Sequence, residues 1–288
     1  MLYYDLASGM RFIFSIYYIG LILISPPIPS LCKREILFTY FKLQLKYVIF
    51  VLIFKKNVLN ETILGLKLSF FDYSTFIFLF EEIFFRNIYY FEAETDNPFI
   101  CDCGANVGIS VLYYKKLYPN CKILAFEPDR RAFRLLKANV RANYFKNVRL
   151  INSAIYNKKG FIKFYYDKAH PESISMSIKK GGRKFTSVRK VPTVLLSSYL
   201  KERVDFLKMD IEGVEDSVIN ELFQAGKLNI VRECVMEYHH HIEPKEDILS
   251  QILQIFEDSH FGYQIYTYFR LPFSREAFQS ILIYAYKK

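Results

Sequence analysis

The chain has 288 residues, of which 52% are apolar and 24% charged. This composition excludes an extended disordered protein and allows one large domain with an appendage. The formal net charge is +10, but residues 1–97 hold nine basic and nine acidic side chains, so the whole excess lies in residues 98–288. Five cysteines in a chain of this length do not form a disulfide scaffold or a zinc pattern. Their use predicts a reduced, cytoplasmic compartment.

The first part of the chain is apolar, with basic residues between the apolar runs. Residues 12–24 form a run of 13 residues, which is short of the ~20 that span a bilayer. A second run covers residues 47–54, and residues 11–56 hold seven basic side chains against one acid, Glu35. We expect residues 1–71 to form a helical extension packed on the main domain. The alternatives are peripheral contact of residues 11–56 with an anionic membrane and, less favoured by length, a membrane anchor.

The stretch over residues 57–97 is acidic and leads into the main domain. Residues 76–85 have a helical pattern, which predicts an amphipathic helix with Glu81 and Glu82 on its solvated side. We place the main domain, including this helix, at residues 72–288.

A strand, a glycine-rich turn and a helix open the core of the main domain. Residues 99–103 predict a short buried strand and residues 109–117 an apolar helix. Glycine lets the backbone turn sharply and lets a ligand come close, and the helix start offers free N–H groups. The pattern is neither the dinucleotide fingerprint nor a phosphate loop. The candidate ligand-binding residues here are Asp102, Gly104, Asn106 and Gly108.

An acid follows the next predicted strand, over residues 122–126. In a doubly wound sheet, an acid at this position lies beside the glycine turn and accepts two hydrogen bonds from a ribose diol. Glu127 stands there, 19 residues after Gly108. It would repel a 2′-phosphate, which disfavours NADP. The alternative is that Glu127 only caps the following helix.

Three motifs together carry a family resemblance. They are Asp102-x-Gly104-Ala105-Asn106-x-Gly108, Phe126-Glu127-Pro128 and Lys208-Met209-Asp210-Ile211-Glu212-Gly213-Val214-Glu215. Over residues 72–269 the chain resembles the FkbM family of S-adenosylmethionine-dependent methyltransferases, and the third motif is the specific one. The resemblance implies an α/β fold of the class I methyltransferase type. This is a Rossmann-like, seven-stranded sheet with helices on both faces, preceded here by an N-terminal helical extension.

The resemblance also implies a cofactor, S-adenosylmethionine, and a set of residues that bind it. These are Asp102, Gly104, Asn106, Gly108, Glu127, Asn152 and Ser153. Within the set, Asp102 and Gly104 would position the methionine part and Glu127 the ribose. Asn152 and Ser153 follow the third predicted strand and would reach the adenine edge. Ordinary loop polarity explains these last two residues equally well.

A group of carboxylates follows the fourth predicted strand, residues 204–209. Ligands of open α/β sheets bind at the carboxyl ends of the strands, where Asp210, Glu212 and Glu215 stand. One could accept a hydroxyl proton, one could bind a divalent cation such as Mg²⁺, and one could hold the methionine amino group. We take Asp210 as a candidate catalytic residue, and Asp210 with Glu212 as candidate metal ligands. Glu215 has a purely structural alternative, because a helix N-terminus favours an acid.

The fifth predicted strand, residues 230–236, ends in an acid and three consecutive histidines. The resemblance places an E-x-H pattern here, matched by Glu237 and His239, and we take both as candidate catalytic residues. A histidine pKa near 6.5 suits a general base, although a structural role for His239 is equally expected. Because consecutive residues of an extended chain point alternately, all three histidines cannot bind one ion, and only His239 and His241 could converge.

A basic insertion covers residues 156–194. Segments 160–166 and 189–194 predict a hairpin, and residues 155–192 hold ten basic side chains against two acids. The tip, residues 179–184, is mostly basic. A solvated surface is the plain explanation, but one-sided charge beside a site also concentrates anionic substrates. A phosphorylated or acidic sugar, or a lipid-linked glycan, would suit it.

The remaining elements complete the fold and the functional expectation. A helix over residues 244–258 and strands over 263–269 and 280–286 close the sheet. The resemblance implies methylation of a hydroxyl on a sugar, polysaccharide, other glycan or related natural product.

Two rival functions also agree with parts of the sequence. A nucleic-acid methyltransferase is favoured by the basic insertion, but the chain lacks the D/N-P-P-Y/F/W segment and the Pro-Cys dipeptide of such enzymes. The carboxylates after the fourth strand would also repel phosphates. The other rival is an inactive, membrane-associated binding module, against which the intact glycine turn, ribose acid and carboxylate group argue.

Overall fold

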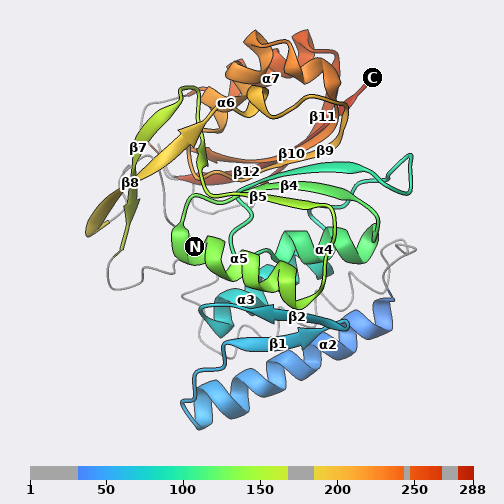
Figure 1. The fold of residues 1–288 in the computed structure, drawn as a ribbon, viewed down its shortest axis with the longest axis vertical. Helices are drawn as coiled ribbons and strands as arrows, with labels where there is room; N and C mark the ends of the chain where they lie inside the picture. The colour runs from blue at the N-terminus through green and yellow to red at the C-terminus, as the bar shows by residue number, and fades with distance from the viewer. Residues whose placement is uncertain (1–31, 168–184, 243–246, 268–277) are drawn as a thin grey trace.

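A seven-stranded sheet forms the centre of the protein (Figure 1). The computed structural model describes residues 32–167, 185–242, 247–267 and 278–288. The sheet has the order β11-β12-β10-β9-β3-β4-β5, parallel except for β12, which pairs antiparallel with β10 and β11. Its strands are β3 (Phe99–Cys103), β4 (Lys122–Phe126), β5 (Val148–Ile151), β9 (Val204–Met209), β10 (Val231–His240), β11 (Phe261–Thr267) and β12 (Gln279–Lys287). The predicted Rossmann-like fold class is confirmed.

Helices cover both faces of this sheet, which is why its inner strands are continuous apolar runs. They are α4 (Ile109–Leu117), α5 (Arg130–Ala142), α6 (Glu215–Gln224) and α7 (Leu249–Asp258). Helices α6 and α7 lie on one face, and α4 and α5 on the other (Figure 1). Two short 3₁₀ turns, η3 (Leu196–Ser198) and η4 (Lys227–Ile230), precede β9 and β10.

A small second sheet stands where the basic insertion is predicted. It has the order β6-β8-β7 and consists of β6 (Ala154–Ile155), β7 (Gly160–Tyr166) and β8 (Ser187–Val194). Strands β7 and β8 pair antiparallel, with Gly160 opposite Thr193. The predicted basic tip at residues 179–184 lies outside the described residues.

The N-terminal part packs beneath α4 and α5. Helix α2 (Lys33–Lys46) runs on without a break into the π-helical η1 (Tyr47–Ile53). The hairpin β1 (Asn60–Ile63) and β2 (Leu66–Ser69) follows, and then α3 (Tyr73–Phe80) continues into η2 (Glu81–Phe85). The apolar run at residues 12–24 lies outside the described residues.

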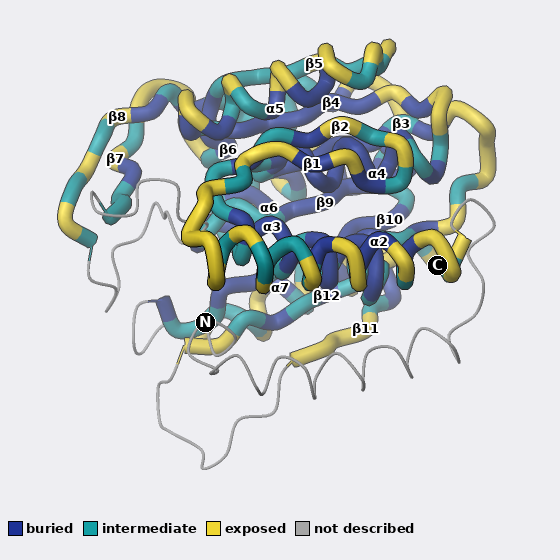
Figure 2. Tube along the Cα trace, turned by 90° about the horizontal axis from the view of Figure 1, so that it is seen from below, coloured by how far each residue is buried: buried dark blue, intermediate teal, exposed yellow. Residues whose placement is uncertain are grey.

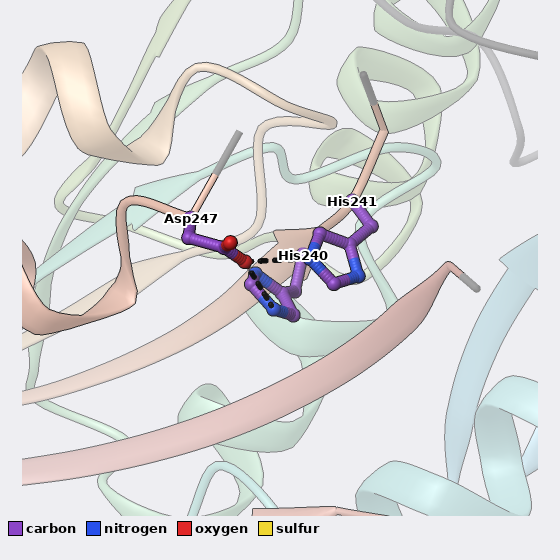
Figure 3. Close-up of side chains that lie close together, drawn as sticks. All are labelled: His240, His241 and Asp247. Atoms are coloured by element: carbon purple, nitrogen blue, oxygen red, sulfur yellow. Dashed lines mark hydrogen bonds and ion pairs between the residues drawn. The ribbon is translucent and has the colours of Figure 1, made fainter. Parts of the chain in front are cut away.

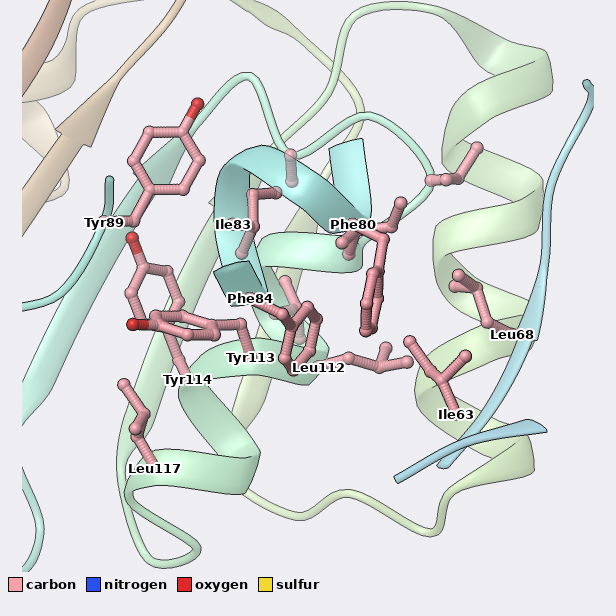
Figure 4. Close-up of a cluster of buried hydrophobic side chains, with 14 of the residues drawn as sticks. Ile63, Leu68, Phe80, Ile83, Phe84, Tyr89, Leu112, Tyr113, Tyr114 and Leu117 are labelled. Carbon is pink, nitrogen blue, oxygen red and sulfur yellow. The ribbon is translucent and has the colours of Figure 1, made fainter. Parts of the chain in front are cut away.

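Aromatic packing joins this N-terminal part to the main domain (Figure 4). Phe80 and Phe84 stack with ring centroids 5.1 Å apart, and the ring of Phe84 meets Tyr113 of α4 edge-on at 5.2 Å. The buried amide of Asn139 on α5 adds polar contacts. It donates to the carbonyls of Ser69 (2.9 Å) and Val107 (2.8 Å), and its oxygen accepts from the Ser69 amide. One side chain therefore links β2, α5 and the glycine turn.

The helix predicted over residues 76–85 forms as α3 and η2, but the prediction that its two acids face solvent is wrong. Glu81 is buried and accepts a hydrogen bond from the Tyr40 hydroxyl at 2.7 Å. Glu82 is only partly exposed, and burial together with nearby Glu237 raises its pKa to about 8. The reason is tertiary, since α2 covers one side of this helix and the main sheet the other.

Candidate active site

The glycine turn after β3 is shaped by its contact with the end of β9. Gly104 has φ +88°, and a Cβ atom added there would lie 1.9 Å from the carbonyl oxygen of Asp210. Only glycine fits such a position. Gly108, with φ +93°, precedes α4, and a Cβ there would lie 2.6 Å from Leu136 Cδ1. The two glycines thus allow the turn to pack against β9 and α5 at once.

A buried ion-pair group supports the turn from below. Asp102 is fully buried and accepts a hydrogen bond from Ser110 Oγ at 2.5 Å. Lys208 Nζ donates to the Gly104 carbonyl at 2.6 Å and lies 3.4 Å from Asp102 and 3.6 Å from Asp210. Burial would lower the pKa of Lys208, but these two carboxylates outweigh it and raise the pKa. The structure therefore places Asp102 beneath the turn and not on its surface.

Glu127 lies beside the turn, at the end of β4. Its carboxylate is buried and accepts hydrogen bonds from the amides of Asn106 (2.8 Å) and Asp129 (2.7 Å). Asp129, not Glu127, is the side-chain cap of α5. Burial raises the pKa of Glu127 to about 8, although the two amide bonds oppose this. Since a carboxylate has about four acceptor sites, two bonds leave capacity for two ribose hydroxyls.

The two residues predicted to meet adenine follow β5. Asn152 Nδ2 donates to the carbonyl of Glu127 at 2.8 Å and to that of Pro128 at 3.2 Å. Ser153 Oγ donates to the Asn152 carbonyl at 2.8 Å. Asn152 therefore holds the segment that carries Glu127, and contact of either residue with adenine stays a prediction.

His239 stands at the centre of the acidic end of the site. Its Nδ1 lies 2.8 Å from Glu215 Oε1, and its Nε2 lies 3.6 Å from Glu212 and 3.9 Å from Glu237. Burial would lower the pKa of His239, but Glu212 and Glu215 outweigh it and hold the pKa well above its usual value. The acids around the ring therefore favour the charged form of the imidazole.

The acids around His239 are held by a tight turn after β9. Glu212 has φ +59° and Gly213 φ +107°, and the Gly213 amide donates to both oxygens of Glu215 at 3.0 and 3.1 Å. His239 lowers the pKa of Glu215 in spite of the opposing effect of burial. Burial and nearby Asp210 raise the pKa of Glu237. Three of the predicted residues, Asp210, Glu237 and His239, thus lie together.

Two groups of side chains in the described part of the chain have the spacing of a cation site. Asp210, Glu212 and His239 each bring one donor atom within 4.8 Å of the others. The second group is His240, His241 and Asp247 (Figure 3), with His241 Nε2 2.7 Å and His240 Nε2 3.8 Å from the Asp247 carboxylate.

His239 and His241, the pair that could have converged, contact different acids, Glu215 and Asp247. Strand β10 extends to His240, and the chain turns at His241, where φ is +56°. This turn stacks the rings of His240 and His241 at 3.7 Å and leaves His239 directed at the carboxylates.

Several site residues had no role in the predictions from sequence. Glu82 lies near Glu237 and Asp210, whose charges, after burial, raise its pKa. Tyr89 donates to Asp210 at 3.5 Å, and Lys208 Nζ lies 5.2 Å from the centre of its ring. The sequence carried one signal for Glu82: residues 72–90 also resemble the helix that precedes the first motif in the FkbM family, which carries a glutamate before a Phe/Ile pair.

A small hollow lies against the glycine turn. Its walls include Phe70, Phe71, Phe76, Asn106 and Val107. Residues 70–79 and the glycine turn therefore line this hollow together. The Asn106 amide in its wall donates to the Glu127 carboxylate.

The pattern of a family described as "Methyltransferase FkbM domain" matches residues 102–265, which contain the turn, Glu127 and the acids around His239. The chain belongs to the FkbM methyltransferase family. It is a methyltransferase by this membership and by its relatives.

Three relatives illustrate the membership. The protein is 30% identical to "Methyltransferase sdnD" of Sordaria araneosa over 215 residues, 64% of this chain and 81% of that one. It is 27% identical to "Methyltransferase 1" of Beauveria bassiana over 165 residues, 50% and 66% of the two chains. It is also 27% identical to "2-O-methyltransferase NoeI" of Sinorhizobium fredii over 142 residues, 44% and 58% of the two chains.

Among solved structures, the FkbM methyltransferase from Methylobacillus flagellatus KT superposes with a TM-score of 0.45 at 18% identity. The match covers 68% of this chain and 45% of that one. TYW2 from M. jannaschii, solved in complex with AdoMet, gives a TM-score of 0.45 at 11% identity, covering 78% and 84% of the two chains.

Proposed function

We propose that the protein is an S-adenosylmethionine-dependent O-methyltransferase. The observation that carries the proposal is the Glu127 carboxylate, held at 2.8 Å from the Asn106 amide on the rim of a turn that only glycine can form. This pairing suits a nucleoside whose two ribose hydroxyls donate to the acid while its tail follows the turn. When bound, S-adenosylmethionine supplies a methyl group on an electrophilic sulfonium.

The acidic end of the site suits a cationic methyl donor. The acids there, Asp210, Glu212, Glu215, Glu237 and Glu82, outnumber the cations His239, Lys208 and Arg86. Burial first, and the neighbouring acids second, raise the pKa values of Glu82 and Glu237. In a poorly solvated site such charges attract a sulfonium or an ammonium group more strongly than in water.

The hydroxyl acceptor needs a group that takes its proton, and we assign this role to His239. Glu215 fixes the ring through Nδ1 at 2.8 Å and leaves Nε2 directed toward the side of Asp210 and Glu237. Because the carboxylates hold the His239 pKa well above its usual value, the neutral form increases with pH. Holding acceptor and donor in line contributes further. The name of the relative NoeI, a 2-O-methyltransferase, supports a hydroxyl acceptor.

The acceptor we propose is a sugar, a polysaccharide or other glycan, or a related natural product, carrying negative charge or linked to a lipid. Support comes from the basic strands β7 and β8, where Lys163 and Lys190 are exposed. Arg189 of β8 lies 2.5 Å from Asp129, two residues after Glu127. This pair fixes the basic hairpin beside the proposed nucleoside site. The buried free cysteines agree with a reducing cytoplasm as the compartment.

A second role for the same side chains is favoured by one observation, the convergence of Asp210, Glu212 and His239 within 4.8 Å. A divalent cation held there would make His239 a ligand through Nε2, with Glu215 orienting its ring. The imidazole ligand suits Zn²⁺, whereas the two carboxylates suit Mn²⁺ or Mg²⁺. Methyl-transfer activity that survives EDTA supports His239 as the general base. Activity that is lost in EDTA and restored by Mn²⁺ supports His239 as a ligand of a divalent cation.

Two measurements test the proposed function. Isothermal titration with S-adenosylmethionine should show binding that Glu127→Gln weakens at least about tenfold, since the side-chain amide keeps only one of the two acceptor oxygens that would meet the ribose hydroxyls. Glu202→Gln, at an exposed ion pair with Lys122, is the matched control and should bind as the natural protein does. Equal affinity of both variants would contradict the assignment.

The transfer itself is tested by radiolabelled methyl incorporation into glycan and glycolipid extracts, with Asp210→Asn as the variant expected to lose activity. RNA and DNA serve as the competing acceptors. Nucleic-acid binding that weakens steeply with salt, together with labelling of nucleic acid alone, would replace the glycan acceptor by the rival one.

A further inference from the structure

The helix formed by α2 and η1 packs on the described part of the protein through one side, and its outer side carries large apolar side chains among basic ones. Ile36, Tyr40 and Leu43 are buried against the main domain. A surface helix normally turns a mostly polar face to the solvent. The outer side of this one is therefore unusual for a surface helix.

Large apolar side chains are concentrated on that outer side. Half of the exposed large apolar side chains in the described part of the chain fall within residues 38–54, and Phe38 is 73% exposed (Figure 2). The set, which we call the outer patch, is Phe38, Phe41, Leu45, Val48, Phe50, Leu52, Ile53 and Phe54. Contiguous apolar surface of this kind marks a site of interaction.

Basic residues surround the outer patch. Arg34 and Lys42 lie exposed along α2, and Lys55 and Lys56 lie exposed just after η1. The only acid between residues 32 and 56 is Glu35. Apolar side chains bordered by Lys and Arg are the composition of a helix that lies on anionic lipid.

The polar contacts of the inner side decide between lying on a membrane and crossing it. By length and composition, Lys33–Ile53 is long enough to span a bilayer, being 21 residues with a mean hydropathy of 1.7 in its most apolar window. However, Tyr40 donates to the buried Glu81 at 2.7 Å, and Lys46 pairs with the buried Glu61 at 2.8 Å. Crossing would break these pairs and leave buried carboxylates without them, whereas lying flat preserves both.

We propose that the outer patch docks the protein on an anionic lipid surface, with the helix axis in the plane of the interface. Residues 38–54 enter the acyl boundary and the flanking lysines meet the headgroups. The inner side of α2 meets η2 through Glu81, and the next residue, Glu82, belongs to the acids of the active site. Docking would thus hold the site near the membrane. The proposal does not depend on the methyl acceptor.

Sedimentation of the full chain with vesicles tests it. Vesicles of phosphatidylcholine containing about one third phosphatidylglycerol should bind at least about tenfold more tightly than phosphatidylcholine alone, and the difference should shrink as salt rises. Phe38→Ser/Leu45→Ser/Phe54→Ser should weaken binding at least about tenfold, because three apolar side chains no longer enter the lipid. Lys42→Glu/Lys56→Glu should weaken it by a similar factor.

The matched control is Tyr144→Ser/Phe161→Ser, which removes two side chains that are 86% and 75% exposed outside the outer patch. It should bind vesicles like the natural chain. All variants should keep the natural unfolding temperature, since the substituted side chains are exposed.

Three outcomes would overturn the proposal. One is equal binding to neutral and anionic vesicles by every variant. Another is a dimer in solution that the triple serine variant dissociates, in a protein that does not sediment with lipid, since the patch would then bind a second copy. The third is binding that appears only when residues 1–31 are removed, since that segment would then be the occupant of the patch.

Discussion

Replacing Gly104 by alanine gives the sharpest test of how the glycine turn is built. The new Cβ would lie 1.9 Å from the Asp210 carbonyl oxygen, whereas real Cβ atoms keep at least 3.0 Å. The ends of β3 and β9 must therefore separate. This movement affects the hydrogen bond from the Asp210 amide to the Cys103 carbonyl, 3.1 Å long, and the bond from Lys208 to the Gly104 carbonyl.

The expected cost combines two contributions. A non-glycine residue at φ +88° is strained by about 1–2 kcal/mol, and each disrupted buried hydrogen bond adds about 1 kcal/mol. We expect Gly104→Ala to lower the free energy of unfolding by at least about 3 kcal/mol and to abolish cofactor binding. Urea titration followed by circular dichroism measures the first effect, and calorimetry with S-adenosylmethionine the second.

Gly226→Ala is the matched control, because Gly226 also has a positive φ, +65°, but has nothing within 4 Å of the added Cβ. It should cost only the strain, about 1 kcal/mol, and leave cofactor binding intact. If the two alanine variants lose similar amounts of stability, the close contact between the turn and β9 does not govern the site.

Three further predictions follow from the buried polar groups. Because burial raises the folded-state pKa of Glu127 from 4.5 to about 8, its contribution to stability is present below pH 4.5 and is lost as pH rises toward 8, at about 1.4 kcal/mol per pH unit. Glu127→Gln should remove that slope from urea midpoints measured between pH 5 and 8, and an unchanged slope would assign it to another group. Asn139→Ala removes the partner of the buried Val107 carbonyl and of the part-buried backbone groups of Ser69 and should cost about 3 kcal/mol, against under about 1 kcal/mol for the exposed pairing with Lys67 lost in Asn143→Ala. Glu215→Gln removes a charge that raises the His239 pKa, so the rising limb of kcat/KM against pH should move to lower pH. A shift to higher pH, or none, would show that His239 is not the base.

The elements of the parallel sheet were predictable, because each is coded by a short local pattern. The strands β3, β4 and β9 and the helix α4 have the predicted bounds. Each is an apolar run closed by a turn signal, and both faces of the sheet are covered, so nothing outside the run alters its length. The positions of Glu127 and Asp210 followed, since the carboxyl ends of parallel strands share one edge.

The histidines show what local pattern misses. Strand β10 continues to His240 because β12, which lies 40 residues further along the chain, pairs with it and sets His239 opposite Ser280 and His240 opposite Gln279. Ser280 also donates to Glu237 at 2.5 Å. Such pairing depends on the closing strands, and no pattern within residues 230–241 records it. The prediction therefore ended the strand early and left His239 and His241, not His240 and His241, as the pair that could converge.

Glu82 was misplaced for a related reason. Helical periodicity distinguishes an apolar stripe from a polar one, but it does not say whether a polar stripe meets water or a polar site. The stripe of η2 meets Asp210 and Glu237, whose charges raise the Glu82 pKa along with burial. A carboxylate on an otherwise aromatic helix was thus a sign of the functional site, although the same pattern is seen where a carboxylate simply faces solvent.

Lys208 connects the two halves of the site, and its position explains why the family's specific motif begins with this lysine. Its Nζ lies between Asp102, beneath the cofactor turn, and Asp210, among the acids that face the acceptor. Without this cation the fully buried Asp102 would lose its ion partner, which costs about 3–5 kcal/mol for a buried charge, and the partly exposed Asp210 would lose one as well. The same cation also limits the negative charge available to a methyl donor. The site therefore retains excess acid at Glu82, Glu212 and Glu237, which Lys208 does not neutralise and which a bound sulfonium would.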